Sequence, residues 1–459
     1  MTAVGSHQVS NPAHRAGARR GLLLDAGFVI VLIGLTLLIS VIGIQRSIEL
    51  SVYDEFTHID YVWQITHGTV PARGDVVDPQ ILSEWACRGQ LLDILPKCGS
   101  PEVADPTNFT ANGVNYNDFH PPLMYSIIAA IAGGIRAVAD VNFITSARLA
   151  DAILLAAGMA LIYLAVRSWR VRRLAAASAS TLLLCMPAFM VAGSTVTNDI
   201  INPFAGAAVI WLLGRVVVAG KAPIVSAALF MAVVAASKVI ATMGLVAAAI
   251  VIAVVGVIRW RQGDRSLALR TLAIPVVMAA VLIVFYFGWD VFQSGRGEQD
   301  YVPSTIGVNS RPLDDTPWTE WFVSLPPSFA LGAGYHLKPT VDGWGVEFTA
   351  LVTTFLASTA AIAGIAAFRW KDPRFAAPAT LLLGLILVPI LVQVQTYLSG
   401  GMFFPMVSNR YGLNMAPLAV LVWALIIHRR KWDWGAAVFG GIGVTLTIVS
   451  MAGLEGFTA

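Results

Sequence analysis

Charged residues are scarce in this sequence. Asp, Glu, Lys and Arg make up 12% of the 459 residues, whereas soluble proteins are nearer a quarter charged. Together with 57% hydrophobic residues and a mean hydropathy of +0.72, this scarcity excludes an ordinary soluble domain. The net charge of +3 does not indicate nucleic-acid binding, because the basic residues gather where they would set membrane topology. We expect an all-α polytopic membrane protein.

Several catalytic and metal-binding signatures are also missing. The sequence has no HExxH, Walker or GxSxG motif and no CxxC pair of the metal type, so neither an energy-coupled pump nor a serine hydrolase has motif support. Internal repeats, low-complexity tracts and heptad arrays are absent. Of the three cysteines, Cys185 lies in an apolar run, whereas Cys87 and Cys98 lie in a polar loop and could pair in an oxidising compartment.

Apolar runs long enough to cross a hydrocarbon core of roughly 30 Å recur along the chain. The first follows a basic tail, residues 1–21, and lacks a small-residue cleavage site, which indicates a retained helix. The sequence predicts about eleven spans: 22–44, 149–166, 174–192, 200–218, 222–237, 239–258, 271–289, 347–367, 376–396, 411–428 and 434–453. A twelfth candidate, 122–138, is short and contains the pair Gly133-Gly134.

The distribution of Lys and Arg decides how segment 122–138 is placed. More than half of these residues lie in short clusters, at 15–20, 167–173, 215–221, 259–270, 369–374 and 429–431. If 122–138 crossed the membrane, the later clusters would lie outside, against the positive-inside rule. We therefore expect 122–138 to be a juxtamembrane helix.

The resulting topology has a cytoplasmic N-terminus and an extracytoplasmic C-terminus, in a multi-pass protein of the plasma (inner) membrane. A single transmembrane domain, 22–453, contains two large outer loops, at 45–147 and 290–346. Amphipathic stretches in these loops, such as 317–334, are expected to lie along the membrane surface.

The stretch VYDEFTHIDY (52–61) places acids and a histidine just after the first span. On a continuing helix, Asp54 and His58 would share a face. Carboxylates beside hydrocarbon are costly unless hydrated or paired, and a half-shielded carboxylate such as Asp54 or Glu55 gains proton affinity, which suits a general base. The alternative is a solvated helix end with surface acids.

Two further polar motifs are expected on the same outer face. NDFHPPLMY (117–125) would hold Asp118 and His120 at the membrane surface, although it could be simple helix punctuation. STVTNDIINP (194–203) brings Asn198 and Asp199 to the outer end of a span, where Asp199 could equally be a helix N-cap.

Two basic positions stand out on an outer face that is otherwise poor in them. Lys238 lies at a tight turn between spans, and Arg410-Tyr411 opens the tenth span. These residues could bind an anionic headgroup such as a lipid phosphate, or they could anchor helix ends at the interface. The acids and histidines of this face could supply oxygen and nitrogen ligands to a divalent metal, but no spacing among them is diagnostic of one.

Taken in order along the chain, six of these motifs resemble the GT-C superfamily of integral membrane glycosyltransferases, in particular actinobacterial-type members of unassigned acceptor. They are YDEFTHIDYVWQITHGTVP (53–71), FHPPLMY (119–125), SARLAD (146–151), TVTNDIIN (195–202), SKVIAT (237–242) and SNRYGLNMAPL (408–418). The resemblance covers the chain to about residue 420. Members of that superfamily take a sugar from a polyprenyl-phosphate carrier.

The resemblance implies roles for individual residues. Asp54 would deprotonate the acceptor hydroxyl with Glu55 supporting it, and Asp60 is a weaker competitor for the role of base. Lys238, Arg410 and Tyr411 would hold the donor phosphate. The remaining polar residues would line the cavity: His58, Asp118, His120, Asn198 and Asp199.

The resemblance also implies a donor and an acceptor. We expect a polyprenyl-phosphate sugar as donor, a cell-envelope glycan or lipid as acceptor, and no essential metal or other cofactor. An acceptor of this kind is favoured because the sequence lacks a large C-terminal soluble domain that could recognise a folded protein. Two other functions stay open: a lipid or polysaccharide transporter or flippase, and a non-catalytic assembly protein.

Overall fold

A computed structural model gives the fold and describes residues 12–90, 94–298, 311–312, 318–323, 325–329, 331, 343–400, 402–403 and 409–454. The described helices are α1 (Pro12–Arg46), α2 (Glu55–Thr66), α3 (Pro79–Arg88), α4 (Leu123–Val138), α5 (Phe143–Arg167), α6 (Arg173–Leu184), α7 (Pro187–Ser194), α8 (Asn202–Leu213), α9 (Ile224–Ala235), α10 (Met243–Arg261), α11 (Arg265–Ser294), α13 (Trp318–Val323), α14 (Leu325–Phe329), α15 (Trp344–Ala367), α16 (Ala376–Gly400), α17 (Ala416–Arg430) and α18 (Asp433–Met451). Two-residue strands, β1 (Arg311–Pro312) and β2 (Met402–Phe403), pair antiparallel.

Short segments of 3₁₀-helix, and a π-helical turn at η5, connect many of these elements. They are η1 (Pro101–Ala104), η2 (Pro106–Asn108), η3 (Thr110–Gly113), η4 (Asn198–Ile201), η5 (Gly214–Val218), η6 (Val239–Thr242), η7 (Pro373–Phe375) and η8 (Asn409–Met415). Three of them, η4, η6 and η8, each lead directly into a long apolar helix, and the polar residues of these turns will form part of the site.

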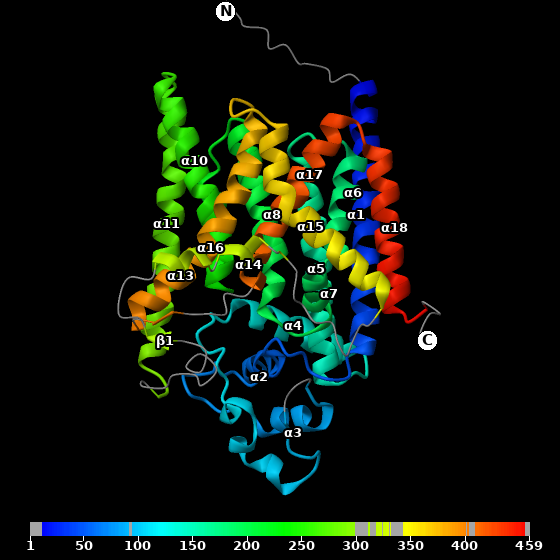
Figure 1. The fold of residues 1–459 in the computed structure, drawn as a ribbon, viewed down its shortest axis with the longest axis vertical. Helices are drawn as coiled ribbons and strands as arrows, with labels where there is room; N and C mark the ends of the chain where they lie inside the picture. Colours follow the sequence, from blue (N-terminus) through cyan, green and yellow to red (C-terminus); the bar gives the residue numbers. More distant parts are fainter. Residues whose placement is uncertain are drawn as a thin grey trace, which may run out of the picture.

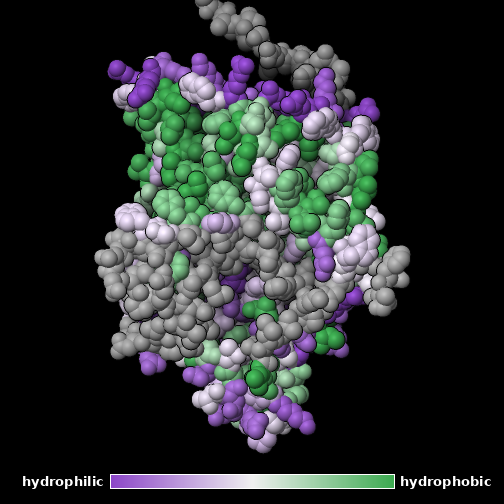
Figure 2. Space-filling view, in the orientation of Figure 1, coloured by the Kyte–Doolittle hydropathy of each residue, from purple (hydrophilic) through white to green (hydrophobic). Residues whose placement is uncertain are grey.

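The long helices form one bundle whose axes run roughly parallel in Figure 1. Among the described residues, nine helices are long and apolar enough to cross a membrane, and a tenth span results if α6 and α7, bent by 72°, count as one. Figure 2 shows an apolar belt around this bundle, between a hydrophilic rim at the top and a more polar region below. The protein is therefore an all-α polytopic membrane protein, as the composition predicts.

By length and composition, nine or ten helices of the described residues qualify as spans, against about eleven expected. The predicted span 222–237 corresponds to α9, which has 12 residues. At 1.5 Å of rise per residue such a helix covers about 18 Å, which is less than a hydrocarbon core of roughly 30 Å. The predicted span 174–192 is broken between α6 and α7, at Pro187.

The basic clusters meet at one end of the bundle, which we call the basic end. Arg167 and Arg173 both form ion pairs with Asp25 of α1, at 2.9 and 3.0 Å. Arg172 donates to the backbone oxygen of His428, at the end of α17, over 2.6 Å. Loops that are far apart in the sequence therefore lie together, as the positive-inside argument requires, at the end where α1 begins (Figure 1).

Residues 47–142 form a cap at the opposite end of the bundle, below it in Figure 1. Within the cap, α4 has 16 residues and packs against both α2 and α5. It is too short for a span, as expected for segment 122–138. Cys87, in α3, and Cys98 are joined by a disulfide. Most of the second expected outer loop, 290–346, lies outside the described residues, and of stretch 317–334 only α13, α14 and residue 331 are described.

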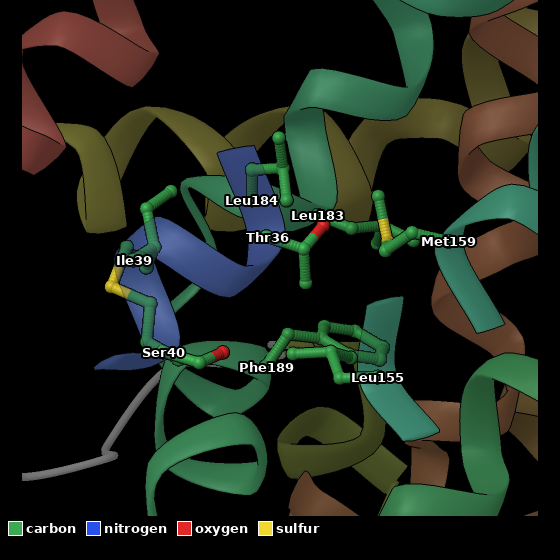
Figure 3. A pocket seen from close by; sticks show the side chains of 9 residues that line it. Thr36, Ile39, Ser40, Leu155, Met159, Leu183, Leu184 and Phe189 are labelled. Carbon is green, nitrogen blue, oxygen red and sulfur yellow. The ribbon is translucent and has the colours of Figure 1, made fainter. Parts of the chain in front are cut away.

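The bend between α6 and α7 packs closely against α1 and α5. Figure 3 shows a small cavity at this bend, lined by Thr36, Ile39, Ser40, Leu155, Met159, Leu183, Leu184, Phe189 and Met190. A Cβ atom at Gly193 of α7 would lie 2.5 Å from both the Ser40 hydroxyl and a methyl group of Leu155. Glycine therefore permits this close approach, which brings the segment after α7 toward the cap.

Candidate active site

Asp54 lies directly before α2, in a strained backbone conformation. Its φ of 61° and ψ of 22° fall in the left-handed region, which aspartate tolerates better than most residues but still at some cost. The hydroxyl of Thr57 donates to the Asp54 carbonyl over 2.7 Å and holds this turn. Strain of this kind clusters at functional positions.

The Asp54 carboxylate is held by two donors. Arg410 Nη2 lies 2.6 Å from Oδ2, and the Tyr116 hydroxyl donates to Oδ1 over 2.8 Å. Burial acts to raise the pKa of Asp54, but the charge and hydrogen bond of Arg410 outweigh it, so the pKa is lowered and the group is ionised. The side chains of Asp54 and Arg410 are 24% and 17% exposed, so a ligand can reach the pair.

A second ion pair joins Lys238 to the segment after α7. Lys238 Nζ donates to Asp199 Oδ1 over 2.6 Å and to Asn198 Oδ1 over 2.7 Å. The Lys238 side chain is only 5% exposed. Burial lowers the pKa of Lys238, and the negative charge of Asp199 opposes that shift. Asp199 thus contributes a charged partner, while Thr197 caps η4.

The two ion pairs belong to one group of charges. His58 is buried in α2 and lies within electrostatic range of Asp54, Lys238, Arg410 and Asp199. The turns η6 and η8, beside Lys238 and Arg410, also contact each other. We call these five residues the charged cluster. Residues from four distant parts of the sequence therefore meet at the end of the bundle opposite the basic end.

His120 and Tyr411 lie at the margin of the charged cluster. His120 is buried and lies within electrostatic range of Lys238 and Arg410. Its burial and, to a smaller extent, these positive charges lower the pKa of His120 well below the usual value. The guanidinium of Arg410 lies 6.0 Å from the centre of the Tyr411 ring. Both residues thus lie beside the charged cluster, and the roles that the resemblance implies for them stay predictions.

Glu55 faces away from the charged cluster, although it follows Asp54 directly. Arg148 of α5 holds its two carboxylate oxygens at 2.7 and 2.8 Å, and the backbone N–H groups of Ser51 and Val196 donate to the same oxygens at 2.7 and 2.9 Å. Glu55 is fully buried, with four donors around it. It is placed to hold the cap on α5, and its expected role beside Asp54 stays a prediction.

Asp60 is also committed to the cap. Its oxygens accept from the backbone N–H of Asp78 (2.8 Å) and from the side chains of Asn115 (2.7 Å) and Gln64 (2.9 Å). Burial raises its pKa to about 6, and these hydrogen bonds oppose that shift. Because both carboxylate oxygens of Asp60 already accept hydrogen bonds within the cap, Asp60 is badly placed to compete with Asp54 as a base.

Asp118 is not part of the charged cluster. The charges that act on it are those of Arg73 and Asp75, in the cap. Burial raises the pKa of Asp118 to about 6. Its backbone oxygen accepts from Gln293 Nε2 of α11 over 2.8 Å, so the Asp118 segment ties α11 to the cap. The expectation that Asp118 lines the same cavity as Asp54 is therefore not supported by its surroundings.

Several residues at the site were not singled out from the sequence. Arg148 and Asp151, both in the SARLAD motif, are buried in α5, and Asp151 accepts from the Thr197 backbone N–H over 2.8 Å. A charged side chain inside an apolar helix was the available signal for both. Tyr116 and Tyr125 gave no comparable signal, because a tyrosine near a membrane surface is ordinary.

Within the described residues, no group of three or more His, Cys, Asp or Glu side chains is arranged to hold a metal ion. The charged cluster offers two cations and two carboxylates instead. Such a set can bind an anion next to a potential base.

Comparison with known proteins gives matches at the level of structure only. No family model matches the chain, and no curated protein does. One similar solved structure is that of ArnT from Cupriavidus metallidurans bound to undecaprenyl phosphate, with 15% identity and a TM-score of 0.47, covering 90% of this chain and 63% of that chain. The apo state of the same protein matches with 16% identity and a TM-score of 0.36, covering 94% of this chain and 77% of that one.

A second similar protein is the apo oligosaccharyltransferase of Archaeoglobus fulgidus. It is 12% identical, with a TM-score of 0.41, covering 93% of this chain and 56% of that chain. This chain thus spans less than two thirds of the chain in two of these structures. The activity therefore has to be inferred from the site itself.

Proposed function

We propose that this protein is a GT-C type glycosyltransferase that moves a hexosyl or pentosyl group from a polyprenyl-phosphate donor to a glycan or lipid acceptor of the cell envelope. The observation that supports this most directly is the contact between Asp54 and Arg410, in one charged cluster with Lys238. A base and two cations, partly shielded from water at one end of a membrane bundle, match what transfer from a lipid phosphate needs.

In the proposed reaction the acceptor hydroxyl oxygen attacks the anomeric carbon of the donor sugar. A new C–O bond forms there while the bond from that carbon to the phosphate oxygen breaks. The hydroxyl proton passes to the Asp54 carboxylate, and polyprenyl phosphate leaves with the electron pair of the broken bond. Lys238 and Arg410 stabilise the charge on the departing phosphate, which is worth most in a poorly hydrated site.

The pairing of Asp54 with Arg410 suggests how donor binding could prepare the base. Arg410 lowers the pKa of Asp54 and so makes it a weak proton acceptor while the two are paired. A phosphate between Lys238 and Arg410 would compete for the Arg410 guanidinium. Loss of that contact would raise the proton affinity of Asp54 when the acceptor is to be deprotonated.

We propose that the site faces the extracytoplasmic side of the plasma membrane. The charged cluster lies at the end opposite the basic end, and basic loops remain in the cytoplasm. The Cys87–Cys98 disulfide, in the cap beside the cluster, fits an oxidising compartment.

The test is mass analysis of lipid-linked sugars and envelope glycans in a deletion strain. The strain should accumulate a lipid-linked sugar, and the wild-type gene should clear it, whereas Asp54→Asn should not. Glu102→Gln is the matched control, because Glu102 is an exposed acid of the same cap. Unchanged glycans in the deletion strain, or full complementation by Asp54→Asn, would argue against the proposal.

A further inference from the structure

His58 is enclosed by the charged cluster, yet only one of its ring nitrogens has hydrogen-bond partners. The residue is 2% exposed, and both contacts of the ring fall on Nδ1: the Tyr125 hydroxyl at 2.9 Å and Asn117 Nδ2 at 3.2 Å. Within the described part of the chain, Nε2 has no partner. Which nitrogen carries the proton decides whether His58 can act as a donor, a base or a metal ligand.

The first chain of hydrogen bonds toward Nδ1 begins at Lys238. An ammonium group only donates, so the Asn198 atom 2.7 Å from Lys238 Nζ must be the amide oxygen. The Asn198 amide nitrogen then faces the Tyr125 hydroxyl at 3.1 Å and donates to it. The proton of that hydroxyl is left to point at His58 Nδ1.

A second and independent chain ends at the same atom. The Asp54 carbonyl can only accept, so the Thr57 hydroxyl 2.7 Å away donates to it. The Thr57 oxygen is then free to accept from Asn117 Nδ2, over 2.6 Å. The second N–H of that amide points at His58 Nδ1.

Two donors therefore converge on Nδ1, so this atom must be the unprotonated acceptor and the ring proton must sit on Nε2. The ring is neutral as well, because burial first, helped by the charges of Lys238 and Arg410 and opposed by those of Asp54 and Asp199, lowers the pKa of His58 to about 3. A neutral Nε2–H cannot accept a proton from an acceptor hydroxyl and cannot bind a metal without losing its own proton.

We propose that His58 uses its Nε2–H to donate a hydrogen bond to an anionic phosphate oxygen held between Lys238 and Arg410. This inference deepens the proposed function and rests on its phosphate-bearing donor. His58 becomes a third donor to the leaving group, and it is neutral where the other two are cations. Tyr125 and Asn117 are positioning residues that fix its tautomer.

The first test reads the tautomer directly, in the full-length wild-type protein with ring-15N histidine. Long-range 1H–15N correlation should show a neutral His58 with protonated Nε2 and bare Nδ1. His67 is an internal reference, because its Nδ1 lies 2.9 Å from the Trp63 carbonyl and must be protonated when that bond forms. A His58 protonated on Nδ1, or charged at neutral pH, would overturn the inference.

The second test measures binding of farnesyl phosphate, a short polyprenyl phosphate. Glutamine can place an N–H near the position of Nε2, whereas the shorter asparagine cannot. His58→Gln should therefore bind within about threefold of wild type, and His58→Asn should bind roughly tenfold more weakly. His67→Asn, on an exposed residue, should bind normally. Equal binding by His58→Asn and wild type would overturn the inference.

The two proposals fail in different ways. Suppose that farnesyl phosphate binds normally and the tautomer is as expected, but deletion of the gene alters no glycan. The proposed glycosyltransferase activity would then be overturned, while the hydrogen bond from His58 to a phosphate would stand. The wrong tautomer, with Asp54-dependent sugar transfer intact, would overturn the role of His58 alone.

Discussion

Asp54 and Glu55 are adjacent acids with opposite surroundings. The Asp54 carboxylate meets Arg410 and remains a quarter exposed, whereas that of Glu55 is fully buried against Arg148. The left-handed backbone at Asp54, directly before α2, separates their directions. Because of this difference, substitution of Asp54 should mainly affect the chemistry, whereas substitution of Glu55 should mainly affect the stability of the fold.

Glu55→Gln should lower the stability of the protein strongly. It leaves the Arg148 guanidinium buried without a charged partner, and breaking such a pair typically costs about 3–5 kcal/mol. Thermal unfolding in detergent should show a clear loss for Glu55→Gln and a smaller one for Asp54→Asn, whose ion pair is partly exposed. A Glu55→Gln protein that is as stable as wild type but inactive would move Glu55 into the chemistry.

The buried pair should also show coupling. Glu55→Leu with Arg148→Met removes both charges at once, so the double variant should lose less stability than the two single variants together. Additive losses would contradict the pairing.

Asp118 should make stability depend on pH. Burial raises its pKa from 3.8 to about 6, so the folded state binds the proton more tightly than the unfolded state. Stability from this group is therefore complete below about pH 4 and falls as the pH rises through about 6. Asp118→Asn should remove that fall and gain on the order of 1–3 kcal/mol over wild type at neutral pH.

The check is thermal unfolding of both proteins across the range from about pH 4 to pH 8. The gap between Asp118→Asn and wild type should widen with rising pH. A gap that is constant with pH would mean that Asp118 is not titrating in this range.

At the scale of elements, α8 and α17 approach each other through a glycine. A Cβ atom at Gly206 of α8 would lie 2.3 Å from Cγ of the Pro417 ring, at the start of α17. A proline ring cannot rotate away, so α17 would have to move, together with η8, which carries Arg410. The packing of two spans and the position of a site residue are thus linked.

Gly206→Ala should therefore destabilise the protein by about 1–3 kcal/mol and reduce sugar transfer. Thermal unfolding and the glycan assay measure the two effects. Gly441→Ala is the control, because Gly441 lies in α18 and an added Cβ there meets nothing within 4 Å. Equal behaviour of the two variants would argue against a tight α8–α17 contact.

Hydropathy predicts the elements well, because an apolar run of about 20 residues has few alternatives to a membrane helix. It does not show how short α9 is, because its 12 residues share the apolar character of the longer spans. It also misses the bend at Pro187, since a broken span and a straight one have similar composition. Such differences depend on tertiary packing.

At the scale of the whole molecule, the sequence predicts that Lys238 and Arg410 share a face with Asp54, and the charged cluster brings them together. Sequence alone could not assign Glu55, because its partner Arg148 lies 93 residues away. Nor could it show that Asp118 and Asp60 have their nearest partners in the cap, since the sequence near an acid does not indicate the direction of its side chain. Such long-range pairings are set by the fold as a whole.

The central claim, that Asp54 is the base of a sugar transfer, is tested most directly in purified protein. The measurement is transfer of radiolabelled sugar from the lipid-linked donors of the native membrane to its envelope glycans. The wild type should transfer sugar, and Asp54→Asn should be slower by about 10²–10⁴-fold while its thermal unfolding shows that it is still folded. Transfer by Asp54→Asn at the wild-type rate would contradict the account.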